Sequence, residues 1–143
     1  MRSAAPLNRD ELEFRLLQVI DASPVATFLL NENHVITHWN RACEVLTGTG
    51  AAKMIGQRDT WRVFTESPAP VLANLLLDGA DEVLLRSIYG DDIRPSPLVA
   101  GGWEAVRFWP RKGRWLAITA APLLDLAGRV VGALETLMDG GPG

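Results

Sequence analysis

The sequence contains few side chains suited to redox, metal or covalent chemistry: one cysteine, two histidines and one tyrosine among 143 residues. Because Cys43 is the only cysteine, an internal disulfide and any Cys-x-x-Cys motif for metal or c-type haem attachment are excluded. This cysteine usage suits a reducing compartment, and we expect a cytoplasmic protein. His34 and His38 lie four residues apart, about 13 Å along a strand, which is too far for both to bind one zinc ion.

Excess positive charge and long apolar runs are also missing. The formal net charge is −3, which argues against nucleic-acid binding because that function needs a concentrated basic face. No apolar run approaches the roughly 18 residues of a membrane span, and no secretory signal is recognisable. We therefore expect no nucleic-acid partner and no membrane contact by this domain. The chain length and its 48% hydrophobic residues predict one domain with one core.

The most structured pattern lies between His34 and Gly56. Residues 35–38 are β-branched-rich and predict a strand. Asn40 then predicts an N-cap for a short helix over residues 41–47, which Gly48 ends in the left-handed conformation. A second short helix is expected over residues 51–55.

The remaining segments predict an α+β fold. We expect a helix beginning at Ser67-Pro68 and ending at Gly79, and a helix over 81–89 with Leu84, Leu85 and Ile88 facing inward. The long segment 91–102 is expected to be a loop. Strands are expected over 25–30, 35–38, 103–109, 115–121 and 130–137. The simplest arrangement is a five-stranded antiparallel sheet with the helices packed on one face.

An N-terminal amphipathic helix should precede this sheet, from the capping box Asn8–Glu11 to about Ala22. It carries two apolar stripes, although a helix lying on one domain needs only one. The stripes are Leu12, Leu16, Val19 and Ile20 on one side and Phe14 and Leu17 on the other. The second stripe covers either the domain's own sheet or a second copy of the chain, and a homodimer through this helix is the partner interaction that we expect.

Three spaced motifs resemble the signature of PAS sensor domains. They are Ile36-Thr37-His38-Trp39-Asn40-Arg41-Ala42, then Leu46-Thr47-Gly48, then Met54-Ile55-Gly56. In addition, residues 132–139 resemble the closing strand of many bacterial PAS domains. The resemblance covers roughly residues 23–139, so we expect a PAS domain there, a flanking helix over 1–22 and a flexible tail over 140–143. It implies that the first and last strands are adjacent at the centre of the sheet.

The resemblance also implies a function. PAS domains act as sensory modules of signal-transduction proteins such as sensor histidine kinases or diguanylate cyclases. They bind a small molecule or a partner domain and relay a conformational signal to an effector, here beyond Gly143, without catalysis of their own. The alternative is a ligand-free PAS module for dimerisation or protein interaction.

Candidate cavity residues come from residue type and from the resemblance. A group of aromatic residues and arginines could line a site for a small carboxylate or an aromatic ligand, because Arg binds carboxylates through paired N–H donors. This group is Trp61, Arg62, Phe64, Arg107 and Trp109. In PAS domains the cavity lies between the inner sheet face and the helices, which adds Phe28, Ile36, Leu72, Leu75, Phe108, Leu116, Ile118 and Leu134. Ordinary core or rim packing is the alternative for each. The junction residues Glu135, Thr136 and Asp139 would relay the signal.

The cofactor and enzyme hypotheses are weak. Haem-binding PAS domains usually take their iron ligand from a helix that here, over residues 71–89, contains no His, Cys or Met. Cys43 does not stand in the sequence context of flavin-binding photosensory domains, so a covalent flavin adduct is disfavoured and any cofactor is unknown. An isomerase-like enzyme needs a buried acid facing an oxyanion donor. Tyr89 is the only tyrosine, and the sequence offers it no obvious acidic partner.

Overall fold

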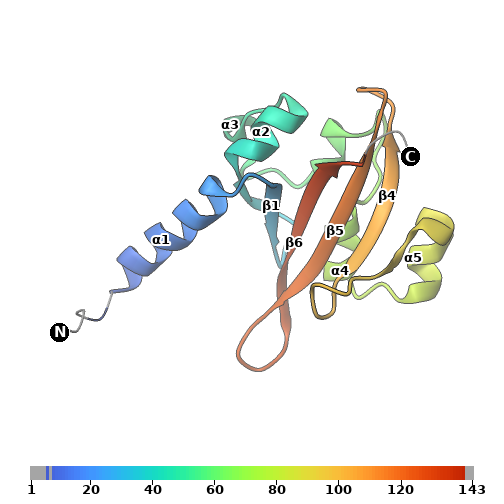
Figure 1. Cartoon of the computed structure of the whole chain (residues 1–143). Coiled ribbons are helices and arrows are strands. Elements are labelled where there is room, and N and C mark those ends of the chain that lie inside the picture. Colours follow the sequence, from blue (N-terminus) through green and yellow to red (C-terminus); the bar gives the residue numbers. More distant parts are fainter. Residues whose placement is uncertain (1–5, 7, 141–143) are drawn as a thin grey trace.

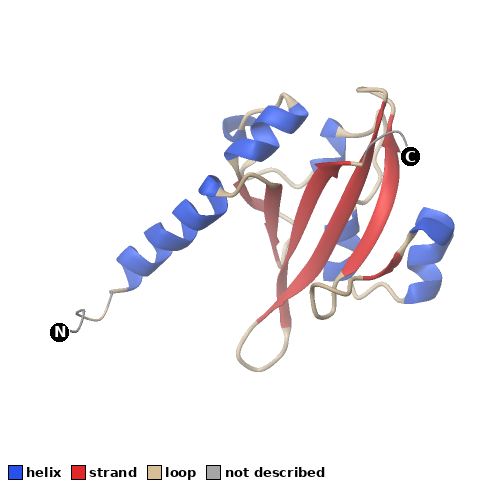
Figure 2. Cartoon of the chain, viewed as in Figure 1, coloured by secondary structure: helices blue, strands red, loops and turns tan. Residues whose placement is uncertain are grey.

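The computed structural model describes residues 6 and 8–140 (Figures 1 and 2). The helices are α1 (Arg9–Ala22), α2 (Arg41–Thr47), α3 (Ala51–Met54), α4 (Leu72–Leu77) and α5 (Glu82–Tyr89), with the 3-10 helices η1 (Thr60–Val63) and η2 (Gly90–Asp92). The strands are β1 (Ala26–Asn31), β2 (Ile36–Trp39), β3 (Arg94–Pro95), β4 (Trp103–Trp109), β5 (Arg114–Leu124) and β6 (Val130–Asp139). Of the expected tail, Gly140 donates its backbone N–H to Trp115 O at 2.8 Å, and residues 141–143 lie outside the described part of the chain.

The strands form one antiparallel sheet in the order β2-β1-β6-β5-β4-β3. The expected adjacency of the first and last long strands is confirmed, since β1 pairs with β6 with Ala26 opposite Leu137. The expectation of five strands was wrong by one, because β3 lies inside the segment expected to be a loop and pairs with the start of β4. Pro95 has no N–H to donate, which is tolerated at the edge of a sheet.

Helices cover one face of this sheet, and α4 lies behind β5 and β6 in Figure 1. The residues that fill the space between the two layers alternate along the strands, as expected for a half-covered sheet. Phe28, Ile36, Leu72 and Leu85 are fully buried there. The predicted α+β architecture with helices on one face is therefore confirmed.

The helix expected to begin at Ser67-Pro68 begins later, at Leu72. Pro68 and Pro70 disfavour helical geometry at the residues before them, so the chain stays non-helical through Pro70. Val71 then caps α4, and the Asn74 side chain accepts a hydrogen bond from the Val71 backbone N–H at 3.0 Å. The segment 64–71 is therefore a loop between η1 and α4.

The inward face of α5 also differs from the prediction. Asp81 caps the helix as expected, with its side chain accepting from the Leu84 N–H at 2.9 Å. Leu85 is buried as expected, but Leu84 and Ile88 are 45% and 42% exposed. Tyr89, one turn after Leu85, is the second buried residue of the helix. This rotation places the only tyrosine of the chain inside the domain.

Asn40 joins three elements at the start of the domain. Its Oδ1 accepts hydrogen bonds from Cys43 N and Thr27 N, both at 2.9 Å. Its Nδ2 donates to Ile20 O at 2.8 Å and Val25 O at 3.0 Å. The N-cap expected from the sequence is thus confirmed, and the same side chain ties the end of α1 and the start of β1 to α2.

Helix α1 projects away from the sheet (Figure 1), and none of its residues is buried. Its large apolar side chains are 45% to 68% exposed, namely Leu12, Phe14, Leu16, Leu17 and Val19. Neither of its two apolar stripes is covered by the domain's own sheet. No helix in the described part of the chain is long and apolar enough to cross a membrane.

Candidate ligand pocket

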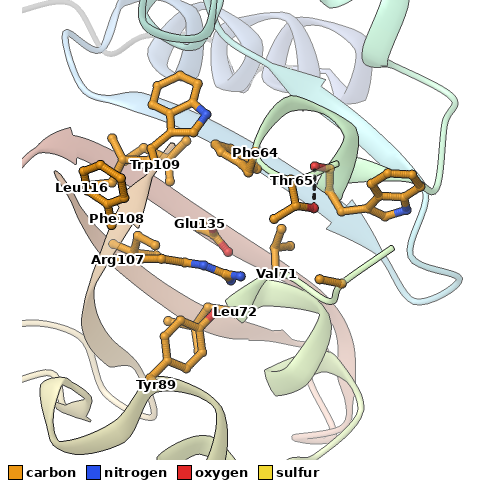
Figure 3. Close-up of a pocket in the computed structure, with 14 residues that line it drawn as sticks. Phe64, Thr65, Val71, Leu72, Tyr89, Arg107, Phe108, Trp109, Leu116 and Glu135 are labelled. Carbon is orange, nitrogen blue, oxygen red and sulfur yellow. Dashed lines mark hydrogen bonds between the residues drawn. The ribbon is translucent and has the colours of Figure 1, made fainter. Parts of the chain in front are cut away.

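A pocket lies between the inner face of β4–β6 and the elements η1, α4 and α5 (Figure 3). Its residues come from η1, the loop 64–71, α4, α5 and the strands β4–β6: Trp61, Phe64, Thr65, Ala69, Val71, Leu72, Tyr89, Arg107, Phe108, Trp109, Leu116, Ile118, Glu135 and Leu137. The cavity volume is about 20 Å³ for the centre of a water-sized sphere, which is room for about one water molecule. A larger guest would need the walls to move.

Glu135 is the most deeply buried ionisable group of the pocket, with 1% of its surface exposed. Its Oε1 accepts a hydrogen bond from the Ala73 backbone N–H at 2.8 Å, which connects β6 to the first turn of α4. Burial raises the pKa of this carboxyl to about 8, while the Ala73 hydrogen bond and the nearby Arg107 charge act in the opposite direction. At neutral pH the Glu135 side chain is therefore mostly a neutral carboxylic acid.

Arg107 and Tyr89 converge on Glu135 from two other elements (Figure 3). The half-buried Arg107 guanidinium lies over the Tyr89 ring, 5.7 Å from its centroid, a cation–π distance. Among the described residues Arg107 forms no ion pair, and the buried Tyr89 Oη has no hydrogen bond of good geometry. Burial, followed by the Glu135 charge, raises the pKa of the Tyr89 phenol. The pocket thus holds three polar side chains with spare hydrogen-bonding capacity in apolar surroundings.

The walls around these groups are aromatic. Phe64 and Trp109 pack with ring centroids 5.6 Å apart, and the buried Trp109 Nε1 donates to Val63 O at 3.1 Å. The loop 64–71 closes the pocket beyond Phe64. Arg111 tethers this loop by donating to Thr65 O at 3.1 Å and to the exposed Glu66 carboxylate at 3.2 Å. Exposed contacts of this kind contribute little stability, so the loop is the part of the wall that opens most cheaply.

Besides Trp109, twelve residues were expected to line a cavity, and seven of these lie in this pocket: Trp61, Phe64, Leu72, Arg107, Phe108, Leu116 and Ile118. Arg107 and Phe64 come together there as the aromatic-plus-arginine hypothesis supposed. Phe108 lies at the edge, 44% exposed and packed edge-on against Trp115. Trp109, considered in the same aromatic group, lines the pocket as well.

The other five residues lie elsewhere. Phe28, Ile36 and Leu75 are buried in the core and do not line this pocket, although Phe28 is the cross-strand partner of Glu135. Arg62 is largely exposed and pairs with Asp59 at 2.9 Å. Leu134 lies on the opposite face of β6 from Glu135, because successive strand residues face opposite sides of a sheet.

Of the residues expected to relay a signal, Glu135 belongs to the pocket itself. Thr136 faces the other side of β6, where its Oγ1 donates to Thr119 O at 3.5 Å. Asp139 ends the strand and lies 3.7 Å from the Arg114 guanidinium in an exposed ion pair. The three residues therefore span the distance from the pocket to the end of the last strand.

Sequence reasoning missed the role of Tyr89. The argument that it lacks an acidic partner was wrong, because the Glu135 charge acts on the Tyr89 phenol within one pocket. Two features of the sequence could have indicated the pair of Glu135 and Tyr89. Glu135 is an acid among mostly apolar residues of β6, and Tyr89 lies one turn after Leu85. A neutral acid beside a phenol is a pair of hydrogen-bond donors rather than a general base.

Other reactive side chains do not form a site. Cys43 is buried, and burial raises the pKa of its thiol, so it behaves as a small core residue. His34 is engaged on both ring nitrogens, with Asn74 Nδ2 at 2.8 Å from Nδ1 and Asp78 Oδ1 at 2.8 Å from Nε2. In the described part of the chain no cluster of His, Cys, Asp and Glu could hold a metal ion.

Comparison with known proteins identifies the class. The family model for the PAS fold matches residues 15–85. The PAS domain of a protein from Colwellia psychrerythraea has a TM-score of 0.52 at 18% identity, over 91% of this chain and 97% of that one. The chain therefore carries a PAS domain, a class of typically sensory, non-catalytic modules. No curated protein matches it in sequence.

Two further structures have the same fold. An RNA-binding Light-Oxygen-Voltage receptor has a TM-score of 0.60 at 20% identity, over 97% of this chain. The present chain spans only 36% of that receptor. The phage VqmA–DPO complex has a TM-score of 0.53 at 19% identity, over 91% of this chain and 53% of that one.

Proposed function

We propose that this PAS domain is a ligand-responsive sensory module that relays a conformational signal to an effector beyond Gly143. The observation that carries the proposal is the buried contact between Glu135 Oε1 and Ala73 N, because it joins the pocket to the strand that leaves the domain. The fold neighbour VqmA, solved in complex with DPO, is a protein of this fold with a bound partner molecule.

The relay rests on the position of α4 between two polar contacts. At its first turn, α4 is held to β6 by the Ala73–Glu135 hydrogen bond. At its end, Asp78 contacts His34 of the β1–β2 turn at 2.8 Å. A ligand that hydrogen-bonds to the Glu135 carboxyl, or changes its ionisation, alters the Glu135–Ala73 hydrogen bond and leaves the Asp78–His34 contact in place. The expected result is a tilt of α4 relative to β6.

The displacement would reach both ends of the domain through the central strands. Leu137, two residues after Glu135 on the same face, pairs with Ala26 at the start of β1. The start of β1, which follows α1, and the end of β6 therefore lie at the same end of these two central strands, so a shift of β6 is passed to the N-terminal helix as well as toward Asp139.

The first test is native mass spectrometry of freshly purified protein with an ultraviolet–visible spectrum. A retained small molecule in the wild type that is lost in Leu72→Trp, a change that fills the pocket, supports the proposal. The matched control is Leu98→Trp, since Leu98 is fully exposed in the loop before β4. A wild type that carries no molecule and shows no change in melting temperature with any member of a metabolite library would contradict it.

The second candidate function is dimerisation through α1 without a ligand. The observation that favours it is the exposure of large apolar side chains from both stripes, 45% to 68% for Leu12, Phe14, Leu16, Leu17 and Val19, on a helix of 14 residues. Isolated helices of this length are marginal in water, so packing against another surface would stabilise it. Analytical ultracentrifugation of the chain with and without residues 1–22 tests this candidate. The same oligomeric state for both proteins would exclude α1 as the dimer contact.

A further inference from the structure

The three polar groups of the pocket share one chemical property: each can donate a hydrogen bond toward the same small space. Arg107 supplies guanidinium N–H groups that have no carboxylate within ion-pair distance among the described residues. Tyr89 supplies an O–H whose oxygen is buried without a well-formed partner. Glu135 uses Oε1 to accept from Ala73, so a proton on the carboxyl belongs to the other oxygen.

A polar guest for this arrangement must therefore be an acceptor. Arg binds a carboxylate better than other acceptors, because its parallel N–H groups match the two oxygens. A phenol and a neutral acid in an apolar pocket form a donor pair that suits an oxyanion. A cationic ligand would be repelled by the Arg107 guanidinium, and a ligand rich in hydrogen-bond donors would find no acceptor there. The charge balance of the cluster at neutral pH is positive, which again favours an anion.

The remainder of the guest must be apolar and flat. Trp61, Phe64 and Trp109 form the wall on the side where the cavity meets the loop 64–71. Aromatic rings of this kind stack on a planar body. Since the cavity holds about 20 Å³, entry requires this loop to move, and its tethers at Thr65 and Glu66 are exposed.

We propose that the pocket recognises a small aromatic carboxylate, with Arg107 and Tyr89 binding the carboxylate group and Glu135 donating a hydrogen bond to it. This inference rests on the proposed function, because it names the ligand class of the same pocket. It assigns Glu135 two roles, since the side chain that contacts the ligand also holds α4 to β6.

The proposal has a defined pH dependence. Above about pH 8 Glu135 ionises, after which it no longer donates and repels the carboxylate. The groups that face Glu135 are Arg107 from β4, Tyr89 from α5 and Cys43 from α2. Burial raises the pKa values of Tyr89 and Cys43, whereas the raised pKa of Glu135 is about 8, so the pH series follows Glu135.

The experiment is isothermal titration calorimetry with benzoate, using benzamide as a neutral probe of the same shape. We expect benzoate to bind at least about tenfold more tightly than benzamide, which corresponds to one charge-assisted contact. Arg107→Gln and Tyr89→Phe should each weaken benzoate binding about tenfold. The control Arg129→Gln, in the exposed β5–β6 turn, should bind benzoate like the wild type.

The pH dependence of benzoate affinity distinguishes a Glu135 that contacts the ligand from one that only supports the fold. Benzoate affinity of the wild type should fall as the pH rises through about 8. In Glu135→Gln, whose amide does not titrate, that fall should disappear.

Three outcomes overturn the proposal: no benzoate binding, equal binding of benzoate and benzamide, or full binding by Arg107→Gln. Tight benzamide binding without benzoate binding refutes the carboxylate as the ligand class, but it supports the proposal that the pocket binds a ligand. Failure of both probes refutes the aromatic carboxylate, and the ligand-responsive function is refuted as well only when the native mass is bare and no member of the metabolite library changes the melting temperature.

Discussion

The domain contains two buried polar clusters that differ in how completely their hydrogen bonds are satisfied. Around Asn40, one amide side chain makes four hydrogen bonds of 2.8 to 3.0 Å to three elements. In the pocket, Glu135 makes one such bond, to Ala73, and Tyr89 Oη makes none of good geometry among the described residues. A satisfied buried network specifies structure, whereas spare buried donors are costly unless a partner molecule uses them.

The largest effect that tests this contrast is expected at Asn40. Asn40→Ala removes an N-cap and leaves the Thr27 N–H and the Ile20 carbonyl without their side-chain partner, while Val25 O keeps the Thr27 hydroxyl. We expect a loss of about 3 kcal/mol in the free energy of unfolding, measured by urea denaturation.

Asn8 provides the matched control for this change. It also caps a helix, accepting from the Glu11 N–H at 2.8 Å, but its exposed side chain has no other hydrogen bond among the described residues. Asn8→Ala should cost about 0.5 to 1 kcal/mol. Equal losses for the two variants would show that the extra bonds of Asn40 contribute nothing to stability.

A second prediction concerns Glu135 and pH. The pKa of Glu135 is raised in the folded state, from 4.5 to about 8, so the folded protein binds the proton more tightly than the unfolded chain. Stability from this group is therefore fully present below about pH 4.5 and is lost as the pH rises to about 8. Glu135→Gln, which keeps an oxygen for the Ala73 N–H, should remove this loss.

The expected gain of Glu135→Gln is about 2 kcal/mol near pH 6, roughly 1.5 pH units above the unfolded pKa of 4.5, with no difference from the wild type near about pH 3. Urea denaturation at both pH values measures it. A constant difference between the two proteins at all pH values would mean that the pKa of Glu135 is the same in the folded and unfolded states.

The smallest effect is expected at Tyr89. Tyr89→Phe removes a buried hydroxyl without a well-formed partner, so the free energy of unfolding should change by less than about 0.5 kcal/mol. The comparison is Thr47→Val, which removes a buried hydroxyl that donates to Cys43 O at 2.7 Å and accepts from Thr49 N at 3.2 Å. That change should cost about 1 to 2 kcal/mol in the same denaturation experiment. A larger loss for Tyr89→Phe than for Thr47→Val would contradict the contrast.

The same contrast explains what could be predicted from the sequence. The cluster around Asn40 follows from local rules: an N-cap, a glycine stop and a short strand within about twenty residues. These rules predicted α2, its cap and the family resemblance correctly. They also predicted the strands of the sheet, apart from the two-residue β3, whose pairing with β4 has no signal in its own residues.

The pocket could not be predicted in the same way, because its polar groups come from three distant elements. Periodicity placed Leu84 and Ile88 inward on α5, whereas the short helix is rotated so that Tyr89 is buried. Leu134 was assigned to the cavity from strand alternation alone, and Glu135 to the signal relay because it lies at the junction with the end of the strand. Arg107 was named as a candidate because Arg binds carboxylates through paired N–H donors.

The measurement that tests the account most directly is the ionisation of Glu135, followed by carbon-detected nuclear magnetic resonance of the side-chain carboxyl groups between acid and alkaline pH. Glu135→Gln assigns the signal by its loss. The account predicts one glutamate that remains protonated at neutral pH and titrates near pH 8. A Glu135 signal that titrates near 4.5, like an exposed carboxyl, would show an ionised group paired with Arg107 and would contradict the donor pocket.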